Sequence, residues 1–288
     1  MMKSIITPEL DSEQKSNIKI GIGSYTYTWA MGVPGYDTQQ AMTAFDLVDK
    51  AVELKAKVVQ FADNAPLDTF SRDELTELLQ LAEKNSVILE VGSRGLTPER
   101  LEHFIIISQI LHSEILRFVI DGKDYQPSPD EVISIIRPFI PKLKETKIKL
   151  VLENHDRLTC DEFSYIIREC NSPYVGICLD TVNSLGVPEG TAEVIRKLLP
   201  YTLNLHVKDF IIERLDHKMG FKVEGAPAGK GKLNIPFLIS ELNRTGQCKT
   251  AILELWTPFG PTLKETIDKE AQWAIESMNY LNQLIINN

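Results

Sequence analysis

The sequence predicts an α/β protein that folds as a single (β/α)8 barrel, the TIM-barrel architecture. Eight short runs of β-type residues alternate strictly with eight amphipathic helical segments, a pattern typical of parallel strands joined by crossovers. The chain has 288 residues, which suits the roughly 250 residues of one barrel, and no linker-like stretch divides it. The rival fold is a doubly wound open sheet, which normally carries a glycine-rich phosphate turn after its first strand. The segment GIGSYTYTW, at residues 21–29, lacks the spacing of that turn.

The eight expected strands are short and rich in β-branched or other apolar residues. They cover residues 18–25, 56–62, 87–93, 114–121, 147–154, 174–180, 202–209 and 250–256. The eight expected helices carry apolar residues at three- and four-residue spacing. They cover residues 38–54, 71–84, 97–112, 128–145, 161–170, 188–199, 235–246 and 262–285.

Capping residues predict where several helices begin. The first helix is expected to start at the Asp–Thr pair of residues 37–38. The second opens with Ser71 and has Glu74 three residues later, which is the spacing of a capping box. The third and fourth open with Thr97 and Ser128, each followed by proline at the first helical position.

Three segments depart from the regular pattern. Pro138 and Pro141 lie inside the fourth helix and are expected to kink or break it. Residues 210–233, after the seventh strand, form the longest irregular connection. Because loops after strands build the active face of a barrel, we expect a lid there. Residues 1–17 lack the apolar core of a signal peptide and are expected to be a loosely ordered lead-in to a barrel of residues 18–288.

The composition limits the classes of partner. The chain has 31 basic and 40 acidic residues, a net charge of −9, so nucleic acid is not the expected partner. The four cysteines form no CxxC pair, which is typical of reduced thiols in a cytoplasmic protein. The strongest apolar run, residues 104–111, falls far short of the ~20 residues that span a bilayer, so no membrane partner is expected. A homo-oligomer is compatible with this composition.

Four consecutive strands, the fifth to the eighth, each end in a group that can bind a metal ion. These groups are Glu153, Asp180, His206 and Glu254. Because the carboxyl ends of barrel strands converge on one site, we expect the four side chains to meet. Three buried carboxylates would repel one another, and a divalent cation removes that conflict. The mainly oxygen donor set suits one Mn²⁺, Mg²⁺, Co²⁺ or Zn²⁺ ion.

Each of these residues also has a simpler interpretation when it is taken alone. Asp180 could cap the turn that follows it, and His206 could be a buried core histidine. Either glutamate could pair with Lys208. The occurrence of all four groups on consecutive strands favours the shared metal site.

Residue alternation predicts which side chains enter the barrel, because residues i and i+2 share one face of a strand. In the seventh strand we expect polar side chains to face the axis and apolar ones to face the helices: Asn204, His206 and Lys208 inward, and Leu203, Leu205 and Val207 outward. Glu90 and Arg117 are expected to form an interior ion pair.

Further residues are candidates for contact with a substrate. His155 lies on the same strand face as Glu153 and could contact a substrate or hold a neighbouring side chain. Lys208 could neutralise the charge of an enolate or simply pair with a carboxylate. Trp29 and Trp256 could form apolar walls for a sugar ring, although core packing is the commoner role of such residues.

Four segments carry a resemblance to a known family: LENH at 152–155, CLDTVN at 178–183, LHVKD at 205–209 and LELW at 253–256. In this order and spacing they resemble the xylose isomerase-like TIM-barrel superfamily, which includes sugar and sugar-phosphate isomerases and epimerases. The segment GAPAGKGKLNIPFLISEL, residues 225–242, also resembles the family's Gly-x-Gly turn leading into the seventh helix. The resemblance covers about residues 18–285.

The resemblance implies site residues and also shows departures. It makes Glu153, Asp180, His206 and Glu254 the metal ligands, and it makes Glu153 and Glu254 the acid/base pair on opposite faces of the substrate. The ketose 3-epimerases of this group have a substrate-binding histidine where this chain has Asn183, and an arginine where it has Ile212. Substrate contacts are therefore expected to differ, with Asn183 at the position of a substrate-binding residue.

The predicted function is that of a divalent-metal-dependent isomerase or epimerase of a sugar, a sugar phosphate or a related ketose. A glutamate would move a proton through a metal-stabilised cis-enediolate. The alternative is a metal-dependent dehydratase, a lyase, acting on a keto-cyclitol or a dehydroshikimate-like compound. An endonuclease IV-like nuclease would need several additional histidines, and this chain has five in all. A non-catalytic sugar-binding module is disfavoured because both candidate acid/base glutamates are present.

Overall fold

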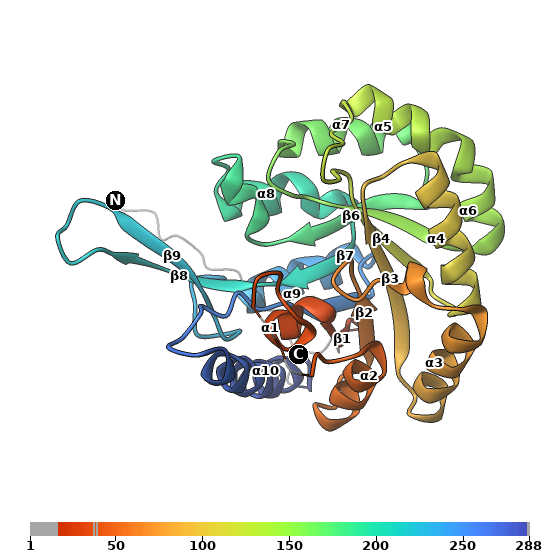
Figure 1. The fold of residues 1–288 in the computed structure, drawn as a ribbon. Coiled ribbons are helices and arrows are strands. Elements are labelled where there is room, and N and C mark those ends of the chain that lie inside the picture. The colour runs from red at the N-terminus through yellow and green to blue at the C-terminus, as the bar shows by residue number, and fades with distance from the viewer. Residues whose placement is uncertain (1–16, 37, 39, 287–288) are drawn as a thin grey trace, which may run out of the picture.

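The computed structural model describes residues 17–36, 38 and 40–286, and within it eight parallel strands close into a barrel. The strand order around the barrel is β1-β10-β7-β6-β5-β4-β3-β2. Helices surround the barrel on its outer side (Figure 1). The predicted single (β/α)8 fold is confirmed. The predicted lead-in lies outside the described residues except for residue 17.

The barrel strands agree with the predicted runs; seven are shorter than predicted, and β3 is shifted by one residue toward the C-terminus. They are β1 (Lys19–Gly23), β2 (Val58–Phe61), β3 (Ile88–Arg94), β4 (Ile115–Val119), β5 (Lys149–Glu153), β6 (Val175–Asp180), β7 (Thr202–Val207) and β10 (Thr250–Leu253). The helices are α1 (Thr28–Met31), α2 (Ala44–Glu53), α3 (Arg72–Lys84), α4 (Pro98–Ile110), α5 (Pro129–Ile136), α6 (Ile140–Thr146), α7 (Cys160–Cys170), α8 (Thr191–Leu198), α9 (Ile235–Thr245) and α10 (Leu263–Ile286). Among these helices, none is both long and apolar enough to cross a bilayer.

Side-chain caps define where most of the outer helices begin. The predicted caps of α3, α4 and α5 are confirmed, because Ser71, Thr97 and Ser128 each accept the backbone N–H three residues later. The predicted start of the first outer helix was wrong. There the chain begins α2 later than expected, because Thr43 and Asp46 form a capping box.

Two prolines interrupt the fourth predicted helix, as expected. Pro138 lies in the 3₁₀ helix η3 (Arg137–Phe139), which separates α5 from α6, and Pro141 lies in the first turn of α6. Proline supplies no N–H for the helical ladder and crowds the preceding turn. The helical layer over β4 and β5 is therefore built from two short helices.

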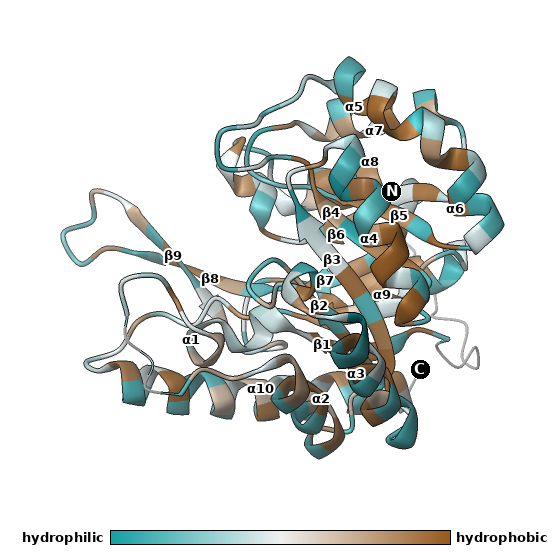
Figure 2. Ribbon diagram, turned by 45° about the vertical axis from the view of Figure 1, so that its right-hand side comes forward, coloured by the Kyte–Doolittle hydropathy of each residue, from teal (hydrophilic) through white to brown (hydrophobic). Residues whose placement is uncertain are grey.

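The main hydrophobic core lies between the barrel and its helices, and the strands are coloured mostly as hydrophobic in Figure 2. A smaller buried cluster consists of Ile115, Val151, Cys178 and Leu203. The prediction that Leu203 faces the helices was wrong. The pairing of β6 with β7 shifts register between Ile177 and Cys178, so strict alternation fails there. A Cβ on Gly176 would lie 2.5 Å from Leu203 Cδ1, so only glycine fits beside the shifted side chain.

The connection after β7 is an antiparallel hairpin, so the predicted irregular loop was wrong. It consists of β8 (Asp209–Arg214) and β9 (Phe221–Ala226), and it projects from the barrel in Figure 1. The base of the hairpin is buried and its tip is exposed. The side chain of Asp209 accepts four backbone N–H groups, those of Phe210, Gly229, Gly231 and Leu233.

Candidate active site

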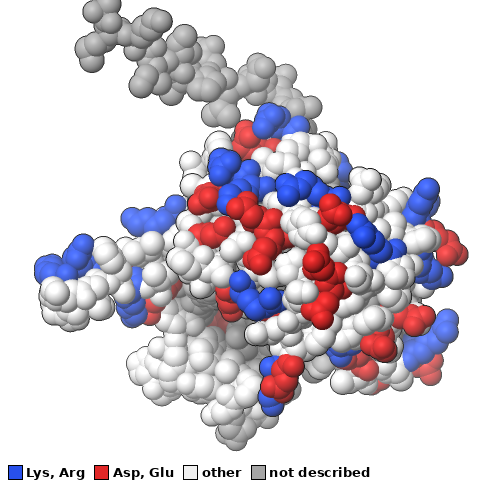
Figure 3. Space-filling view, turned by 90° about the horizontal axis from the view of Figure 1, so that it is seen from above, with Lys and Arg blue, Asp and Glu red and all other residues white. Residues whose placement is uncertain are grey.

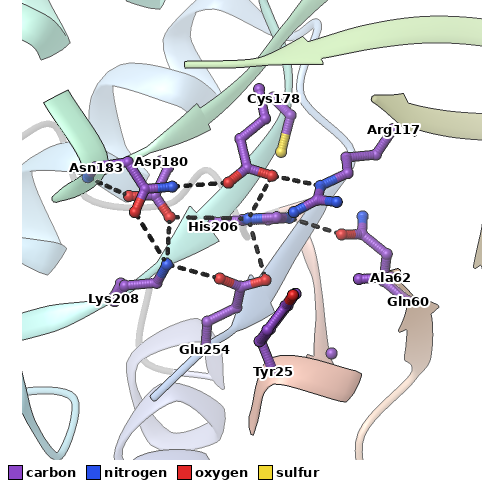
Figure 4. A network of polar contacts seen from close by, with 12 residues as sticks. Tyr25, Gln60, Ala62, Arg117, Cys178, Asp180, Asn183, His206, Lys208 and Glu254 are labelled. Carbon is purple, nitrogen blue, oxygen red and sulfur yellow. Dashed lines mark hydrogen bonds and ion pairs between the residues drawn. The ribbon is translucent and has the colours of Figure 1, made fainter. Parts of the chain in front are cut away.

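The structure brings the four predicted metal-binding residues together at the carboxyl ends of the strands. Glu153 and Asp180 end β5 and β6, His206 lies one residue before the end of β7, and Glu254 follows β10. His206 Nδ1 lies 3.3 Å from Glu254 Oε1, 3.6 Å from Glu153 Oε2 and 3.9 Å from Asp180 Oδ2. All four side chains are almost completely buried. In Figure 4 the labelled Asp180, His206 and Glu254 point toward one common region.

The hydrogen bonds of His206 assign its tautomer. His206 Nε2 lies 2.6 Å from Gln60 Oε1. The amide nitrogen of Gln60 donates to Glu90 Oε2 at 2.9 Å and to Asn204 Oδ1 at 3.1 Å, so the oxygen of Gln60 must face the histidine. The proton therefore lies on Nε2, and the lone pair of Nδ1 is directed at the three carboxylates.

This arrangement fits a divalent cation. Among the described residues, His206 Nδ1 is buried without a hydrogen-bond partner, and the buried Glu153 Oε2 and Asp180 Oδ2 contact the cationic groups of Arg117 and Lys208. Atoms bound to one divalent ion at about 2.1 Å lie roughly 3.0–3.4 Å apart, close to the separations found here. A lone pair facing three carboxylates is electrostatically unfavourable without a cation between them. Glu153, Asp180, His206 and Glu254 could therefore hold one metal ion.

Lys208 is a second source of positive charge beside these carboxylates. Its Nζ lies 2.9 Å from Asp180 Oδ2 and 2.9 Å from Glu254 Oε2, so it pairs with both residues (Figure 4). Burial alone would lower the pKa of Lys208, but Asp180, Glu254 and Glu153 raise it above its ordinary value. Lys208 is thus a fixed cation and not a proton acceptor at neutral pH.

Asn183 and Asp180 show how the turn after β6 supports the site. Asn183 Nδ2 donates to Glu153 Oε1 at 2.8 Å, and the Asn183 side chain also lines the pocket. Asp180 Oδ1 accepts the backbone N–H groups of Val182 and Asn183, both at 2.8 Å. The simpler interpretation of Asp180 as a cap is therefore correct for one of its oxygens, and its other oxygen faces His206.

Arg117 does not pair with Glu90, and that prediction was wrong. The fully buried guanidinium of Arg117 instead forms ion pairs with Glu153 and, at 3.6 Å, with Asp63 Oδ1. Glu90 is hydrogen-bonded to Gln60 and Asn204, and burial raises its pKa above the ordinary range despite those bonds. Both residues point into the barrel, but Arg117 reaches toward the carboxyl end of β5 and so meets Glu153.

These side chains surround a cavity of about 470 Å³. Its lining includes the predicted contact residues His155, Asn183, Lys208, Trp29 and Trp256, together with Glu153 and Glu254. Two of these residues can shape an apolar surface. Trp29 packs against the rings of Tyr36 and Phe259, and Trp256 is 38% exposed with Lys208 Nζ 5.6 Å from its ring centre.

One further group lines the cavity at the carboxyl end of β3. Arg94 Nε donates to Asp63 Oδ2 at 3.2 Å, and Arg94 Nη2 lies 3.4 Å from His155 Nε2. Asp63 Oδ2 also accepts the hydroxyl of Tyr25 at 3.2 Å. Asp63 therefore links Tyr25, Arg94 and Arg117 along one part of the pocket lining.

The segment that carries Trp29 is fixed by a carboxylate of α10. The backbone N–H groups of Trp29 and Ala30 donate to Glu270 Oε1 and Oε2 at 3.0 and 3.1 Å. The indole Nε1 of Trp29 donates to the backbone oxygen of Thr257 at 2.8 Å. Glu270 has no solvent exposure, and burial raises its pKa to about 7 although the backbone N–H groups of Thr28, Trp29 and Ala30 oppose the shift.

Residues 48–284 match the family described as xylose isomerase-like TIM barrel. The chain belongs to this family. The predicted resemblance is therefore confirmed.

Proteins similar to this chain differ in the reactions that their names give. The chain is 29% identical over 264 residues to the 3-oxo-isoapionate decarboxylase of Pectobacterium atrosepticum, covering 91% of this chain and 94% of that protein. A solved structure of a xylose isomerase-like TIM barrel protein from Mycobacterium smegmatis in complex with magnesium has a TM-score of 0.69 at 15% identity, covering 94% and 98% of the two chains. The D-psicose 3-epimerase of Clostridium cellulolyticum H10 with D-tagatose has a TM-score of 0.67 at 15% identity, covering 91% and 99%. The two structural similarities show a shared fold.

Sequence reasoning missed the residues that support the four strand-end groups. Gln60 lies near the end of β2, Asp63 lies two residues after that strand, and Arg94 is the last residue of β3. Strand-end position would have found Asp63 and Arg94. Nothing in the sequence separates Gln60 from an ordinary buried amide.

Proposed function

We propose that this protein is a metal-dependent decarboxylase of a 3-oxo sugar acid, with Glu153, Asp180, His206 and Glu254 as metal ligands. The observation that carries the proposal is the charge of the pocket. Three cations lie in or beside it, and four carboxylates face or pair with them: Arg94, Arg117 and Lys208 against Asp63, Glu153, Asp180 and Glu254. Their net charge is −1, and a divalent cation changes it to +1. A small monoanion restores neutrality.

A 3-oxo acid satisfies this requirement before and after its carbon–carbon bond breaks. The C1–C2 bond breaks, CO2 leaves, and the electron pair passes to the C3 carbonyl oxygen as an enolate. One proton from water then adds to C2 and gives the ketone. The negative charge therefore moves from the carboxylate to the carbonyl oxygen without leaving the pocket.

Each residue of the site has a defined part in this reaction. A divalent cation bound there would supply Lewis-acid polarisation of the carbonyl. Lys208 is permanently protonated and lies beside Asp180 and Glu254, so its Nζ can stabilise charge that develops on the substrate oxygen. Trp29 and Trp256 line the cavity and can exclude water from the carbon chain.

The contacts of the two glutamates favour decarboxylation over proton abstraction. Glu153 is paired with Arg117 and accepts from Asn183, and Glu254 is paired with Lys208. Opposite charges and hydrogen bonds to a carboxylate lower its basicity. Loss of CO2 needs an electron acceptor and no general base at carbon. The sequence similarity to a named 3-oxo acid decarboxylase, over most of both chains, supports the same reaction class.

The isomerase or epimerase predicted from the sequence is the second candidate. Glu153 and Glu254 both line the cavity, as a two-base proton transfer requires, and a named ketose epimerase shares the fold. This reaction and the alternative dehydration begin from a C–H bond adjacent to the carbonyl, so they need a free base. A nuclease is disfavoured because His103, His112 and His217 lie outside the cavity lining.

The experiment compares the two candidates on one preparation. The enzyme is loaded in turn with Mn²⁺, Mg²⁺, Co²⁺ and Zn²⁺ and incubated with a synthetic five- or six-carbon 3-oxo aldonic acid. We expect CO2 and ketone in equal amounts, well above the spontaneous rate. The same preparations are given ketoses, sugar phosphates, inososes and dehydroshikimate in D2O. If deuterium entered a ketose and no 3-oxo acid released CO2 enzymatically, the proposed decarboxylase would be rejected in favour of an isomerase or epimerase.

We also propose that the enzyme acts in the cytoplasm on a small carbohydrate acid. All four cysteines are buried free thiols, which suits a reducing compartment. In Figure 3 basic and acidic side chains are interspersed over the face shown, and no broad basic surface for nucleic acid stands out on it.

A further inference from the structure

We propose that Arg94 is the subsite that binds the carboxylate of the substrate, and that Asp63 and His155 orient its guanidinium for this purpose. The inference deepens the proposed function and rests on it for the identity of the acid. It assigns a role to a residue that lies outside the group of metal-binding side chains. The observations that carry it are the contacts, the exposure and the charge of Arg94.

Arg94 is held on one side and free on another. Its Nε donates to Asp63 Oδ2 and its Nη2 faces His155 Nε2. Asp156 Oδ2 lies 3.1 Å from His155 Nδ1, which places the ring proton there and leaves Nε2 to accept from Arg94. Arg94 Nη1 has no partner among the residues that the structure describes. Its N–H groups are available to a ligand.

The exposure of Arg94 agrees with a binding role. Its side chain is 35% exposed and lines the same cavity as Glu153, Glu254 and Lys208. Arg117, by contrast, is fully buried and engaged with Glu153, so it cannot turn toward a ligand. Both guanidinium groups line the cavity, and Arg94 is the more exposed of the two, with 35% of its side chain exposed against 2% for Arg117.

The local charge requires an anion at this position. Asp63 is shared between Arg94 at 3.2 Å and Arg117 at 3.6 Å, and Arg117 also serves Glu153. Once Glu153 binds a metal ion, Asp63 is the carboxylate left for the two guanidinium groups, so one guanidinium charge would lack a full counterion at the Arg94 end of the pocket. A planar carboxylate matches the fork geometry of arginine, and its single charge matches the net charge of the metal-loaded pocket. A dianionic phosphate would carry one negative charge more than the metal-loaded pocket neutralises.

This assignment predicts how Arg94 affects turnover. The carboxylate loses its charge as CO2 forms, so the contact with Arg94 is stronger in the bound substrate than in the transition state. Arg94 therefore contributes to substrate binding and not to the chemical step. Replacing it should raise KM and leave kcat unchanged or slightly higher.

The first test measures binding without turnover, so it does not depend on decarboxylation. Calorimetric titration of the Mn²⁺-loaded protein uses three four-carbon probes: erythronate, erythritol and erythritol 4-phosphate. We expect erythronate to bind most tightly. In Arg94→Gln its affinity should fall about 10- to 100-fold, the range for loss of a charged hydrogen bond, while erythritol binding is unchanged. Arg94→Lys should restore part of the loss, and Arg72→Gln, an exposed arginine at the start of α3, is the matched control.

The outcomes separate the subsite from the function. Equal binding of erythronate by Arg94→Gln and the unchanged protein overturns the subsite, even if the enzyme releases CO2. Tighter binding of the phosphate, lost in Arg94→Gln, assigns Arg94 to a phosphate and overturns the carboxylate. If erythronate binding depends on Arg94 but no 3-oxo acid releases CO2, the carboxylate subsite is supported and the decarboxylase function is rejected. For an active enzyme, an Arg94→Gln variant with unchanged KM and reduced kcat contradicts the binding role.

Discussion

The hydrogen bond between His206 Nε2 and Gln60 Oε1 determines which ring nitrogen of His206 faces the carboxylates. Gln60 is itself oriented by Glu90 and Asn204, so the tautomer depends on a chain of three buried polar side chains. Loss of such an outer contact typically lowers metal affinity about 10- to 100-fold. The precision of the site thus comes partly from residues that never touch the substrate.

Gln60→Leu should weaken Mn²⁺ binding by about 10- to 100-fold. The leucine cannot accept the Nε2 proton, so the other tautomer, with its proton toward the carboxylates, becomes populated. Calorimetric titration measures the change, and Gln109→Leu, on the exposed side of α4, controls for a polar-to-apolar replacement. Unchanged affinity in a folded Gln60→Leu protein would show that the tautomer is set in another way.

Lys208→Met should separate metal binding from catalysis. Loss of a buried cation beside Asp180 and Glu254 removes repulsion toward the metal ion, so Mn²⁺ should bind at least as tightly. The loss of one group that stabilises developing negative charge typically lowers kcat about 10²–10³-fold. Calorimetry and CO2 release on the same sample test both parts. Weaker metal binding with normal kcat would contradict the assigned role.

At this scale the sequence predicted the four convergent groups because their positions follow from strand ends and alternation. It did not predict the partner of Arg117. Arg117 and Glu90 both point inward, but pairing depends on the height of each side chain along the barrel, which is set by strand stagger. It also failed at Leu203, because the register shift between β6 and β7 leaves no signal in residue alternation.

Among the elements, α10 and α1 form the contact that positions a pocket wall. Glu270 of α10 accepts two backbone N–H groups at the start of α1, which carries Trp29. A carboxylate there is favoured by the N–H groups and opposed by its complete burial. Burial has the larger effect, and the pKa of Glu270 is raised to about 7.

The pKa of Glu270 predicts a loss of stability as pH rises. The folded value of about 7 lies above the ordinary 4.5, so the folded state binds this proton more tightly than the unfolded state. The contribution of Glu270 is fully present below about pH 4.5 and is lost as pH rises through about 7, with a total of roughly 3 kcal/mol.

The measurement is urea unfolding of the protein and of Glu270→Gln between pH 5 and pH 8. The glutamine variant cannot titrate, so the free energy of unfolding of the unchanged protein should fall relative to the variant across this range. If the free energies of unfolding of the two proteins changed in parallel with pH, Glu270 would keep the same charge between pH 5 and pH 8.

Element boundaries were predicted where a local signal exists. Ser71, Thr97 and Ser128 mark helix starts because each cap forms within three residues. The hairpin after β7 was missed because its two short strands need each other, and neither shows enough alternation alone. The two strands pair across a turn, and the residue pattern of either strand alone does not indicate that pairing.

In the whole molecule, closure of the barrel places the proposed metal ligands of four separate βα units within a few ångströms. Folding therefore gathers three carboxylates into one buried site. A metal ion that binds only this folded arrangement must stabilise the entire domain.

Removal of divalent metal should lower the melting temperature. An ion present at one hundred times its dissociation constant stabilises the folded state by about 2.7 kcal/mol, which for a chain of this size corresponds to roughly 5 °C. Scanning calorimetry with Mn²⁺ and with EDTA measures the difference. The Glu153→Gln/Asp180→Asn double variant should show no response to Mn²⁺, and a full response in that variant would place the ion elsewhere.

The projecting hairpin makes the enzyme suitable for attachment to other molecules. Its tip, where Met219 is 84% exposed, is separated from Lys208 by a ladder of six residue pairs. Asp209 fixes the base of that ladder through four backbone N–H groups, so strain at the tip ends before it reaches the site. A reporter domain or an affinity handle inserted in the turn at residues 215–220 would extend from the barrel and leave the pocket intact.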